Sequence, residues 1–336
     1  MHSLLRLHAV AVGIGVAAIA VLITSCGEGD TLTVYSGRSE NLVSPIIRQF
    51  EDATGIDVRV KYGETPKLAI TLLEEGANSP TDLFFAQDPS GLGAVEQMLS
   101  PLPDSILARV PEWARSPNGT WVGISGRART LVYSTEALTE TDLPDDIWDL
   151  TEPQWKGRIG WAPRNASFQT MVTAMRVLWG EERARQWLEG MLSNDPKEFE
   201  KNTPQVVAAA AGEIDVGLVN HYYLHRFLAT EGESYPARNY HVRAGGPGAI
   251  VMVAGAGILT TADNQEGAEQ FLEFMLSQAG QQYFASQTHE YPLVEGVVVS
   301  RELVPLEEIN QPAIALADLA DLEGTVRLLR ETGVIP

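Results

Sequence analysis

The stretch at residues 31–90 reads TLTVYSGRSENLVSPIIRQFEDATGIDVRVKYGETPKLAITLLEEGANSPTDLFFAQDPS. It contains short apolar strands at 31–35, 56–60 and 82–85, separated by helical spacing at 42–50 and 68–73 and followed by a helix from about Ser90. Strand–helix alternation of this kind predicts a parallel sheet covered by helices. Because such sheets bind ligands beyond the carboxyl ends of their strands, we expect residues 36–40, 62–65 and 86–90 to form a common mouth.

The rest of the chain predicts a second lobe. All seven tryptophans lie between Trp113 and Trp187, which indicates a separate core in the middle of the chain. Beyond it, the pattern predicts strands at 214–219 and 249–259 and helices at 205–212 and 267–278. The simplest architecture is α/β, with two lobes and a cleft between them.

Charge and cysteine content exclude several classes of protein. The 336 residues include 24 Lys and Arg against 44 Asp and Glu, a formal net charge of −20. A simple duplex nucleic-acid binder needs a basic surface, so we expect no nucleic-acid partner. One cysteine cannot form a disulfide framework, a zinc ribbon or an iron–sulfur cluster.

The N-terminus is typical of an exported protein. A basic start and an apolar run at 9–24 predict a secretory signal over residues 1–25, and the run is shorter than the roughly 20 residues that span a bilayer. Cys26 follows directly, in an arrangement that resembles a bacterial lipobox, so we expect lipidation at Cys26 and a tether at 26–30. This predicts a bacterial cell-envelope protein, in the periplasm or on the outer face of the cell membrane, that contacts the membrane through its lipid only. The alternative is an ordinary signal with an incidental cysteine.

Adjacent tyrosines follow the predicted strand at 214–219. Tyr222 and Tyr223 would leave the sheet at its ligand-binding edge. Deprotonated phenol oxygens suit a hard, highly charged cation such as Fe³⁺, and binding would then release protons. The residues alone leave two interpretations open, a metal site and an ordinary aromatic contact between lobes.

Short motifs in matching order and spacing resemble the bacterial ferric-ion-binding proteins, the periplasmic solute receptors of iron(III) ABC importers. They are VYSGR at 34–38, ATGI at 53–56, SGRAR at 125–129, WKGRIG at 155–160, NHYY at 220–223 and EYPL at 290–293. The resemblance runs from about Thr31 to the C-terminus. It implies a two-lobed periplasmic binding protein fold of type II, with the ligand in the cleft and the chain crossing between lobes more than once.

From the resemblance we expect lobe 1 at 31–127, lobe 2 at 128–250, a return to lobe 1 at 251–300 and a return to lobe 2 at 301–336. It implies a receptor rather than an enzyme, which captures Fe³⁺ and delivers it to an ABC permease and its ATPase. The family's tyrosine ligands correspond to Tyr222 and Tyr223. Its structural asparagines correspond to Asn202 and Asn220.

The sequence departs from the family pattern in the other lobe. Ser39 stands where members often have a histidine, and Gln87 replaces an expected glutamate. We therefore place both side chains around the site rather than on the metal. The phosphate-holding loop of some members corresponds to Asn165, Ala166 and Ser167, and has no tyrosine.

Two phenolates leave ferric iron with one formal positive charge and open coordination positions. We expect an exogenous anion such as carbonate, phosphate or a citrate-like carboxylate, bound by Arg127 and Arg164 with Asn165, Ala166 and Ser167. Arg38 and Arg129 either join that site or form ion pairs. Tyr62 or Glu40 are alternative additional iron ligands.

Other functions stay open at this stage. One alternative is an importer receptor for another solute, such as an anionic or phosphorylated compound, a polyamine or a thiamine-like molecule. A lipid-anchored hydrolase is more distant, because the chain shows no nucleophile elbow and no paired acids. We expect His221, His225 and His289 to be structural residues rather than direct ligands.

Overall fold

The computed structural model describes residues 31–336. The predicted signal at 1–25, the tether at 26–30 and the lipidation at Cys26 lie outside the described residues. Within 31–336, no helix has both the length and the apolar character needed to cross a membrane.

The N-terminal segment forms the expected strand–helix alternation. Strand β1 pairs in parallel with β2 on one side and β3 on the other. Helix α1 buries one apolar stripe that includes Leu42, Ile46 and Phe50. The elements are β1 (Thr31–Ser36), α1 (Glu40–Thr54), β2 (Asp57–Tyr62), α2 (Thr65–Glu75), β3 (Leu83–Ala86), α3 (Pro89–Ala94) and the short α4 (Asp104–Leu107).

The turns after these three strands meet at one edge, as predicted. The Gly37 amide donates to the Phe85 carbonyl (2.8 Å), and the Gly63 amide donates to the Ser36 carbonyl (3.1 Å). The Gln87 amide donates to Thr65 Oγ1 at 2.9 Å. A Cβ on Gly37 would lie 2.0 Å from Thr65 Oγ1, so only glycine permits this close approach.

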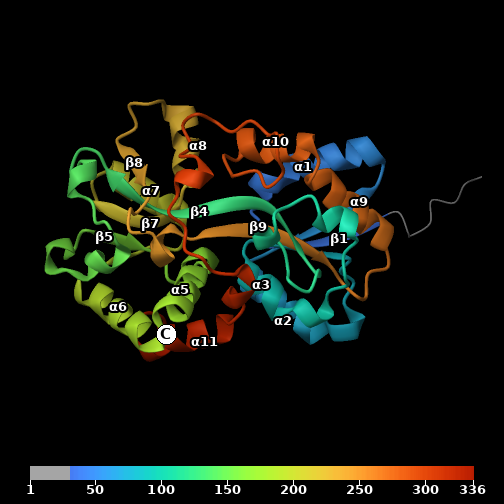
Figure 1. Cartoon of the computed structure of the whole chain (residues 1–336), viewed down its shortest axis with the longest axis horizontal. Helices are drawn as coiled ribbons and strands as arrows, with labels where there is room; N and C mark the ends of the chain where they lie inside the picture. The colour runs from blue at the N-terminus through green and yellow to red at the C-terminus, as the bar shows by residue number, and fades with distance from the viewer. Residues whose placement is uncertain (1–30) are drawn as a thin grey trace, which may run out of the picture.

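Two long strands connect the lobes. Figure 1 shows β4 (Val122–Ser134) and β9 (Val251–Ile258) running across the middle of the molecule. Strand β9 is antiparallel to both β3 and β4. The sheet is therefore mixed, and the expectation of a parallel sheet holds only for β1, β2 and β3 in this part of the fold.

The other end of β4 belongs to the second lobe, where it pairs antiparallel with β7 and β8. Strand β7 is parallel to β5, which is parallel to β6. The elements of this lobe are β5 (Ile159–Trp161), α5 (Ala166–Trp179), α6 (Glu181–Ser193), β6 (Lys197–Glu198), α7 (Asn202–Ala210), β7 (Val216–Asn220), α8 (Tyr222–Glu231) and β8 (Ala237–Tyr240).

After β9 the chain forms α9 (Gln265–Met275), α10 (Gln278–Gln287) and, at its end, α11 (Leu322–Glu331). The single helix predicted at 267–278 is wrong in its extent, because α9 ends at Met275. Ser277 then caps a new helix, its Oγ accepting a hydrogen bond from the Gly280 amide. Helix α11 packs beside α5 in the second lobe (Figure 1).

Each lobe has its own core, but the tryptophans do not all belong to one of them. Trp155, Trp161 and Trp187 lie in the core of the second lobe. Trp121 lies in the core of the first lobe, and Trp113 packs against both. The tryptophan-rich segment therefore includes the start of β4, which serves both lobes.

Candidate metal centre

The tyrosine pair is placed by a fixed junction between β7 and α8. Asn220 ends β7 opposite Arg129 on β4, and Tyr222 is the first residue of α8. Between them, the His221 amide donates to the Ala128 carbonyl (3.0 Å), and the Ala128 amide donates back to His221 Nδ1 (3.1 Å). These reciprocal bonds hold the start of α8 against β4.

Tyr222 and Tyr223 stack on one another, with ring centroids 4.3 Å apart and planes 29° apart. Tyr222 is 0% exposed and packs with residues of the first lobe's core, although its helix belongs to the second lobe. Its hydroxyl has no hydrogen-bond partner among residues 31–336. Tyr223 is partly exposed. Burial and the neighbouring Tyr222 raise the pKa of Tyr223 well above its ordinary value, while Arg38 and Arg127 act in the opposite direction.

Strand β4 brings polar side chains to the same place. Ser125, Arg127 and Arg129 are two residues apart along β4, so they lie on one face of the strand. All three are buried. The SGRAR motif thus places Arg127 and Arg129 near each other and near the tyrosines, close enough for their charges to interact.

Arg127 is 0% exposed, and its Nε, Nη1 and Nη2 atoms have no hydrogen-bond partner among the described residues. A buried guanidinium without an acceptor costs free energy, so such a group is kept where it binds something else. This arrangement fits an anion with several oxygens.

Arg129 is held by neutral oxygens. Its Nη1 donates to Oδ1 of Asn220 (3.1 Å) and Oδ1 of Asn202 (3.4 Å), and lies 3.5 Å from Oγ of Ser167. Its Nε and Nη2 have no partner within the described part of the chain. Burial and the positive charge of Arg127 lower the pKa of Arg129 to about 9.

The start of α5 lies beside Arg129. Asn165 caps the helix, with its Oδ1 accepting from the Ser167 amide (3.2 Å), from Ser167 Oγ (2.6 Å) and from Asn202 Nδ2 (3.2 Å). Ala166 is the partly buried first residue of the helix. The structure thus brings together the predicted Asn165, Ser167, Asn202 and Asn220 around one arginine.

Arg38 comes from the first lobe and has a carboxylate partner. Its Nη2 donates to Oε1 of Glu290, and Ser125 Oγ donates to Oε2 of the same carboxylate. The Arg38 Cζ lies 6.0 Å from the centre of the Tyr222 ring. Burial acts to lower the pKa of Arg38, but Glu290 and the tyrosine oxygens outweigh it and raise that pKa.

Sequence reasoning assigned no role to Glu290. The residue lies in the quoted EYPL motif, but its partner Arg38 is 252 positions away, so no local spacing links the two. The contact between Arg38 and Glu290 could be found only from the three-dimensional structure.

Several predicted residues lie apart from the pair. Arg164 has a side chain 63% exposed and pairs with Glu198 at 3.5 Å. Ser39 and Glu40 are exposed, and Tyr62 packs against the first lobe's core with Glu40 and Arg48 near it. Among residues 31–336, no hydrogen bond, ion pair or ring contact joins these residues to Tyr222 or Tyr223. Gln87 lies at the mouth, with its Nε2 buried and unpartnered within that range.

Of the nearby histidines, His221 has both ring nitrogens in hydrogen bonds, whereas His225 Nδ1 and His289 Nδ1 are buried without a partner among the described residues. His221 Nδ1 accepts from Ala128, so its proton is on Nε2, which donates to the His289 carbonyl at 2.8 Å. Both ring nitrogens are therefore in use. His225 stacks on His289, and both line cavities outside the tyrosine pair. Burial, followed by the charge of His225, lowers the pKa of His221 well below its ordinary value.

The described residues contain no group of three or more His, Cys, Asp or Glu side chains that could hold a metal ion. A metal at this place would depend on phenol oxygens and on oxygens from an added anion. Stacked tyrosines beside buried arginines provide both kinds of contact, because phenolates bind the cation and guanidinium groups bind the anion.

The chain is similar in sequence to known bacterial solute-binding proteins. The family described as "Bacterial extracellular solute-binding protein" matches residues 77–314. The major ferric iron-binding protein of Neisseria meningitidis is 34% identical over 311 residues, covering 90% of this chain and 93% of that protein.

Solved structures agree in fold. Iron-bound HitA from Pseudomonas aeruginosa is 34% identical, has a TM-score of 0.86, and the match covers 90% of this chain and 99% of that one. A Trichodesmium protein (IdiA, FutA) in complex with iron and citrate ligands is 29% identical, with a TM-score of 0.78 and the same coverage. The two-lobed periplasmic binding protein fold expected from the sequence is confirmed.

Proposed function

This chain belongs to the ferric iron-binding family of bacterial periplasmic solute-binding proteins, a family of receptors rather than enzymes, and we propose that it captures Fe³⁺ for an ABC importer. Tyr222 and Tyr223 bind the ion through their phenol oxygens, and an exogenous anion completes the coordination. The loaded receptor then docks on a membrane permease driven by an ATPase.

One observation supports this proposal above the others. The Tyr222 hydroxyl and all three Arg127 nitrogens are buried without a partner among residues 31–336, and they belong to the same site. A protein that only packed its lobes together would satisfy or replace such groups, because each unpaired group costs about 1–3 kcal/mol. A cation on the phenol oxygens and an anion on the arginine satisfy both.

Proton release makes iron binding possible at neutral pH. Burial disfavours the Tyr223 phenolate, so its pKa in the metal-free protein is raised. A trivalent ion at bonding distance outweighs that effect, and the phenol protons leave when iron binds. Arg38 and Arg127 assist, because positive charge near the oxygens stabilises their negative form.

The anion neutralises the positive charge that remains on the iron and on the nearby arginines. Two phenolates reduce the ion's formal charge from three to one, and Arg127 and Arg129 add uncompensated positive charge nearby. Carbonate, phosphate or a citrate-like carboxylate would bind the arginines in a planar or forked geometry and offer oxygens to the iron. Arg127, Arg129 and the start of α5 are the groups that meet this need, whereas Arg164 is exposed and paired with Glu198.

Attachment to the envelope is a separate part of the proposal. Cys26 follows the predicted signal at 1–25, and lipidation there would keep the receptor close to its permease. Mass spectrometry of the protein purified from bacterial membranes should show a lipid on Cys26. A mature N-terminus at another residue, without lipid, would contradict this part alone.

Metal and anion binding together test the central proposal. Purified protein, dialysed against ferric iron with bicarbonate, phosphate or citrate, should retain one iron per chain and lose it when Tyr222 and Tyr223 are both phenylalanine. Retention of an anion without any iron, unaffected by that double substitution, would instead indicate a receptor for an anionic or phosphorylated solute.

A further inference from the structure

Glu290 is a buried acid that pairs with one of the three buried arginines near the tyrosines. It is 0% exposed and forms the ion pair with Arg38, whereas Arg127 and Arg129 have no carboxylate partner among residues 31–336. Of these three buried guanidinium groups, only that of Arg38 has a carboxylate partner within the described residues. Because Glu290 neutralises Arg38, the uncompensated positive charge that a ligand can meet lies on Arg127 and Arg129.

The chain around Glu290 is fixed from both lobes. Tyr291 and Gly126 exchange backbone hydrogen bonds of 2.9 and 2.7 Å, which ties the segment to β4. The His289 carbonyl accepts from His221 Nε2, next to the tyrosine pair. His289 has a φ of 56°, a left-handed conformation that is uncommon for a non-glycine residue. Glu290 is thus held at one position between Arg38 and Ser125.

We propose that Glu290 is a positioning residue that sets the charge of the anion taken with iron. By neutralising Arg38, it limits the anion-binding charge to Arg127 and Arg129. It also keeps the Arg38 guanidinium beside the Tyr222 ring, where Nη2 donates to Glu290 and Nε has no partner among residues 31–336. This inference rests on the proposed function and extends it to the selection of the anion.

The physical consequence has a definite sign. Without the Glu290 charge, Arg38 becomes a third uncompensated cation in a buried site. Charges a few ångströms apart interact strongly there, so a multivalent anion gains affinity for the metal-free protein by about tenfold or more. Bare ferric iron meets more repulsion and loses affinity. A purely structural role would lower both affinities together.

The test compares Glu290→Gln with Glu295→Gln, the same chemical change at an exposed position on the following loop. Calorimetry measures citrate and phosphate binding to metal-free protein, and iron affinity is measured with and without citrate. For Glu290→Gln we expect tighter citrate binding by about tenfold, a smaller gain for phosphate, and weaker iron binding when citrate is absent. Glu290→Asp should lie between this variant and the wild type.

A charge-paired variant separates electrostatics from folding. Arg38→Gln/Glu290→Gln removes both charges and should return citrate affinity towards that of the wild type, even if Glu290→Gln alone folds poorly. Parallel loss of citrate and iron binding in Glu290→Gln, or behaviour equal to Glu295→Gln, would overturn the inference. So would a double variant with citrate affinity far from the wild type in either direction.

The same measurements distinguish a failure of the iron-binding function from a failure of the role of Glu290. If wild-type protein binds no iron under any anion, the proposed function fails, whatever Glu290 does. If wild-type protein binds iron with an anion but Glu290→Gln leaves the anion preference unchanged, only the role of Glu290 fails.

Discussion

Arg127, which we propose binds the anion, is a buried charge whose burial costs the fold free energy. Its guanidinium is fully buried, and its nitrogens find no acceptor among residues 31–336. Taking a charge out of water without a partner is expensive, and apolar replacements of buried charges are often neutral or stabilising. Function and stability therefore make opposite demands at this position.

We expect Arg127→Met to stabilise the metal-free protein by about 1–3 kcal/mol and to abolish the tightening of iron binding by bicarbonate. Urea unfolding and iron titrations with and without bicarbonate measure the two effects. Arg129→Met is the matched control, because it leaves the amide oxygens of Asn202 and Asn220 without their donor and should not stabilise. A destabilised Arg127→Met that keeps its anion dependence would contradict this account.

The buried histidines predict how stability depends on pH. Burial lowers the pKa of His241 from 6.5 to about 4, so between these values the unfolded chain binds a proton that the folded chain does not. Stability is therefore complete above about pH 6.5 and falls as the pH decreases towards 4, by about 1.4 kcal/mol per pH unit for each such group.

Urea unfolding of metal-free protein at pH 7.5 and pH 5 tests this dependence. His241→Gln cannot take up that proton in the unfolded state, so its stability should decrease less between the two values than that of the wild type. His225, whose pKa is also lowered to about 4 by burial and by its histidine neighbours, should behave in the same way. An equal decrease in the variant and the wild type would show that groups other than His241 cause the loss of stability between pH 7.5 and pH 5.

Individual site residues could be predicted from the sequence where they lie in a short motif. Tyr222 and Tyr223 are adjacent, and Arg127 lies in the short SGRAR motif at 125–129. The contact of Glu290 with Arg38 joins residues 252 positions apart, so no pattern along the chain encodes it. Arg164 precedes the Asn165 cap, but an exposed side chain can turn to a nearby acid, and here it meets Glu198.

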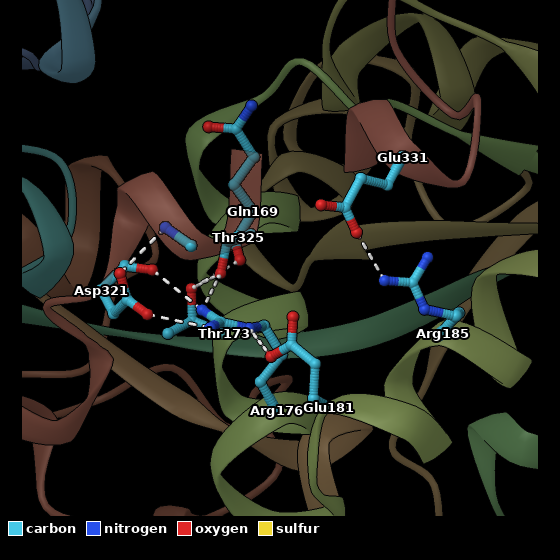
Figure 2. Close-up of polar contacts among 9 residues, drawn as sticks. Gln169, Thr173, Arg176, Glu181, Arg185, Asp321, Thr325 and Glu331 are labelled. Atoms are coloured by element: carbon cyan, nitrogen blue, oxygen red, sulfur yellow. Dashed lines mark hydrogen bonds and ion pairs between the residues drawn. The ribbon is translucent and has the colours of Figure 1, made fainter. Parts of the chain in front are cut away.

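At the scale of elements, the docking of α11 on α5 depends on one arginine. Arg176 on α5 is 12% exposed and donates to Glu181, to Asp321 at the start of α11 and to Thr325 (Figure 2). Thr325 also shares a buried hydrogen bond of 2.7 Å with Thr173. Among residues 31–336, Arg185 has Glu331 as its one ion-pair partner (Figure 2), and its side chain is more exposed than that of Arg176, at 28%.

We expect Arg176→Ala to reduce the free energy of unfolding by about 1–2 kcal/mol, because it removes a mostly buried guanidinium that bonds α5 to both Asp321 and the buried Thr325. Arg185→Ala is the control and should change it by less than about 1 kcal/mol, as is usual for an exposed ion pair. Urea unfolding measures both. Equal effects, or none for Arg176→Ala, would show that α11 is held by its apolar face alone.

Helices and strands could be predicted from the sequence where the spacing of apolar residues within the segment identifies them. Period-two and helical spacing identified β1, β2 and β3 and helices α1 and α2 within a few residues. Strand direction was not predictable, because β9 reads as an apolar run whether it lies parallel or antiparallel to β3. The break between α9 and α10 was also missed. The apolar pattern continues through Leu276, after α9 has ended at Met275, and Ser277 then begins α10 as its N-cap.

At the scale of the whole molecule, the structure is closed around the tyrosines. Tyr222 belongs to a helix of the second lobe yet is 0% exposed among residues of the first. Under the proposed function, iron and anion reach that side chain when the lobes separate, and the contacts that they make in the closed form favour closure. Strand and helix patterns alone predicted two α/β lobes with a cleft, and the resemblance to the ferric-ion-binding proteins added the periplasmic binding protein fold and a chain that crosses between the lobes more than once.

The central claim is that the stacked phenols bind ferric iron, with an anion on the arginines beside them. Its most direct test is a visible-absorbance titration of the purified protein with ferric iron, with and without bicarbonate, beside the variant Tyr222→Phe/Tyr223→Phe. The account predicts a phenolate-to-iron charge-transfer band at one iron per chain, stronger binding with bicarbonate, and no band in the double variant. A band that persists in the double variant, or no band in the wild type under any anion, would contradict it.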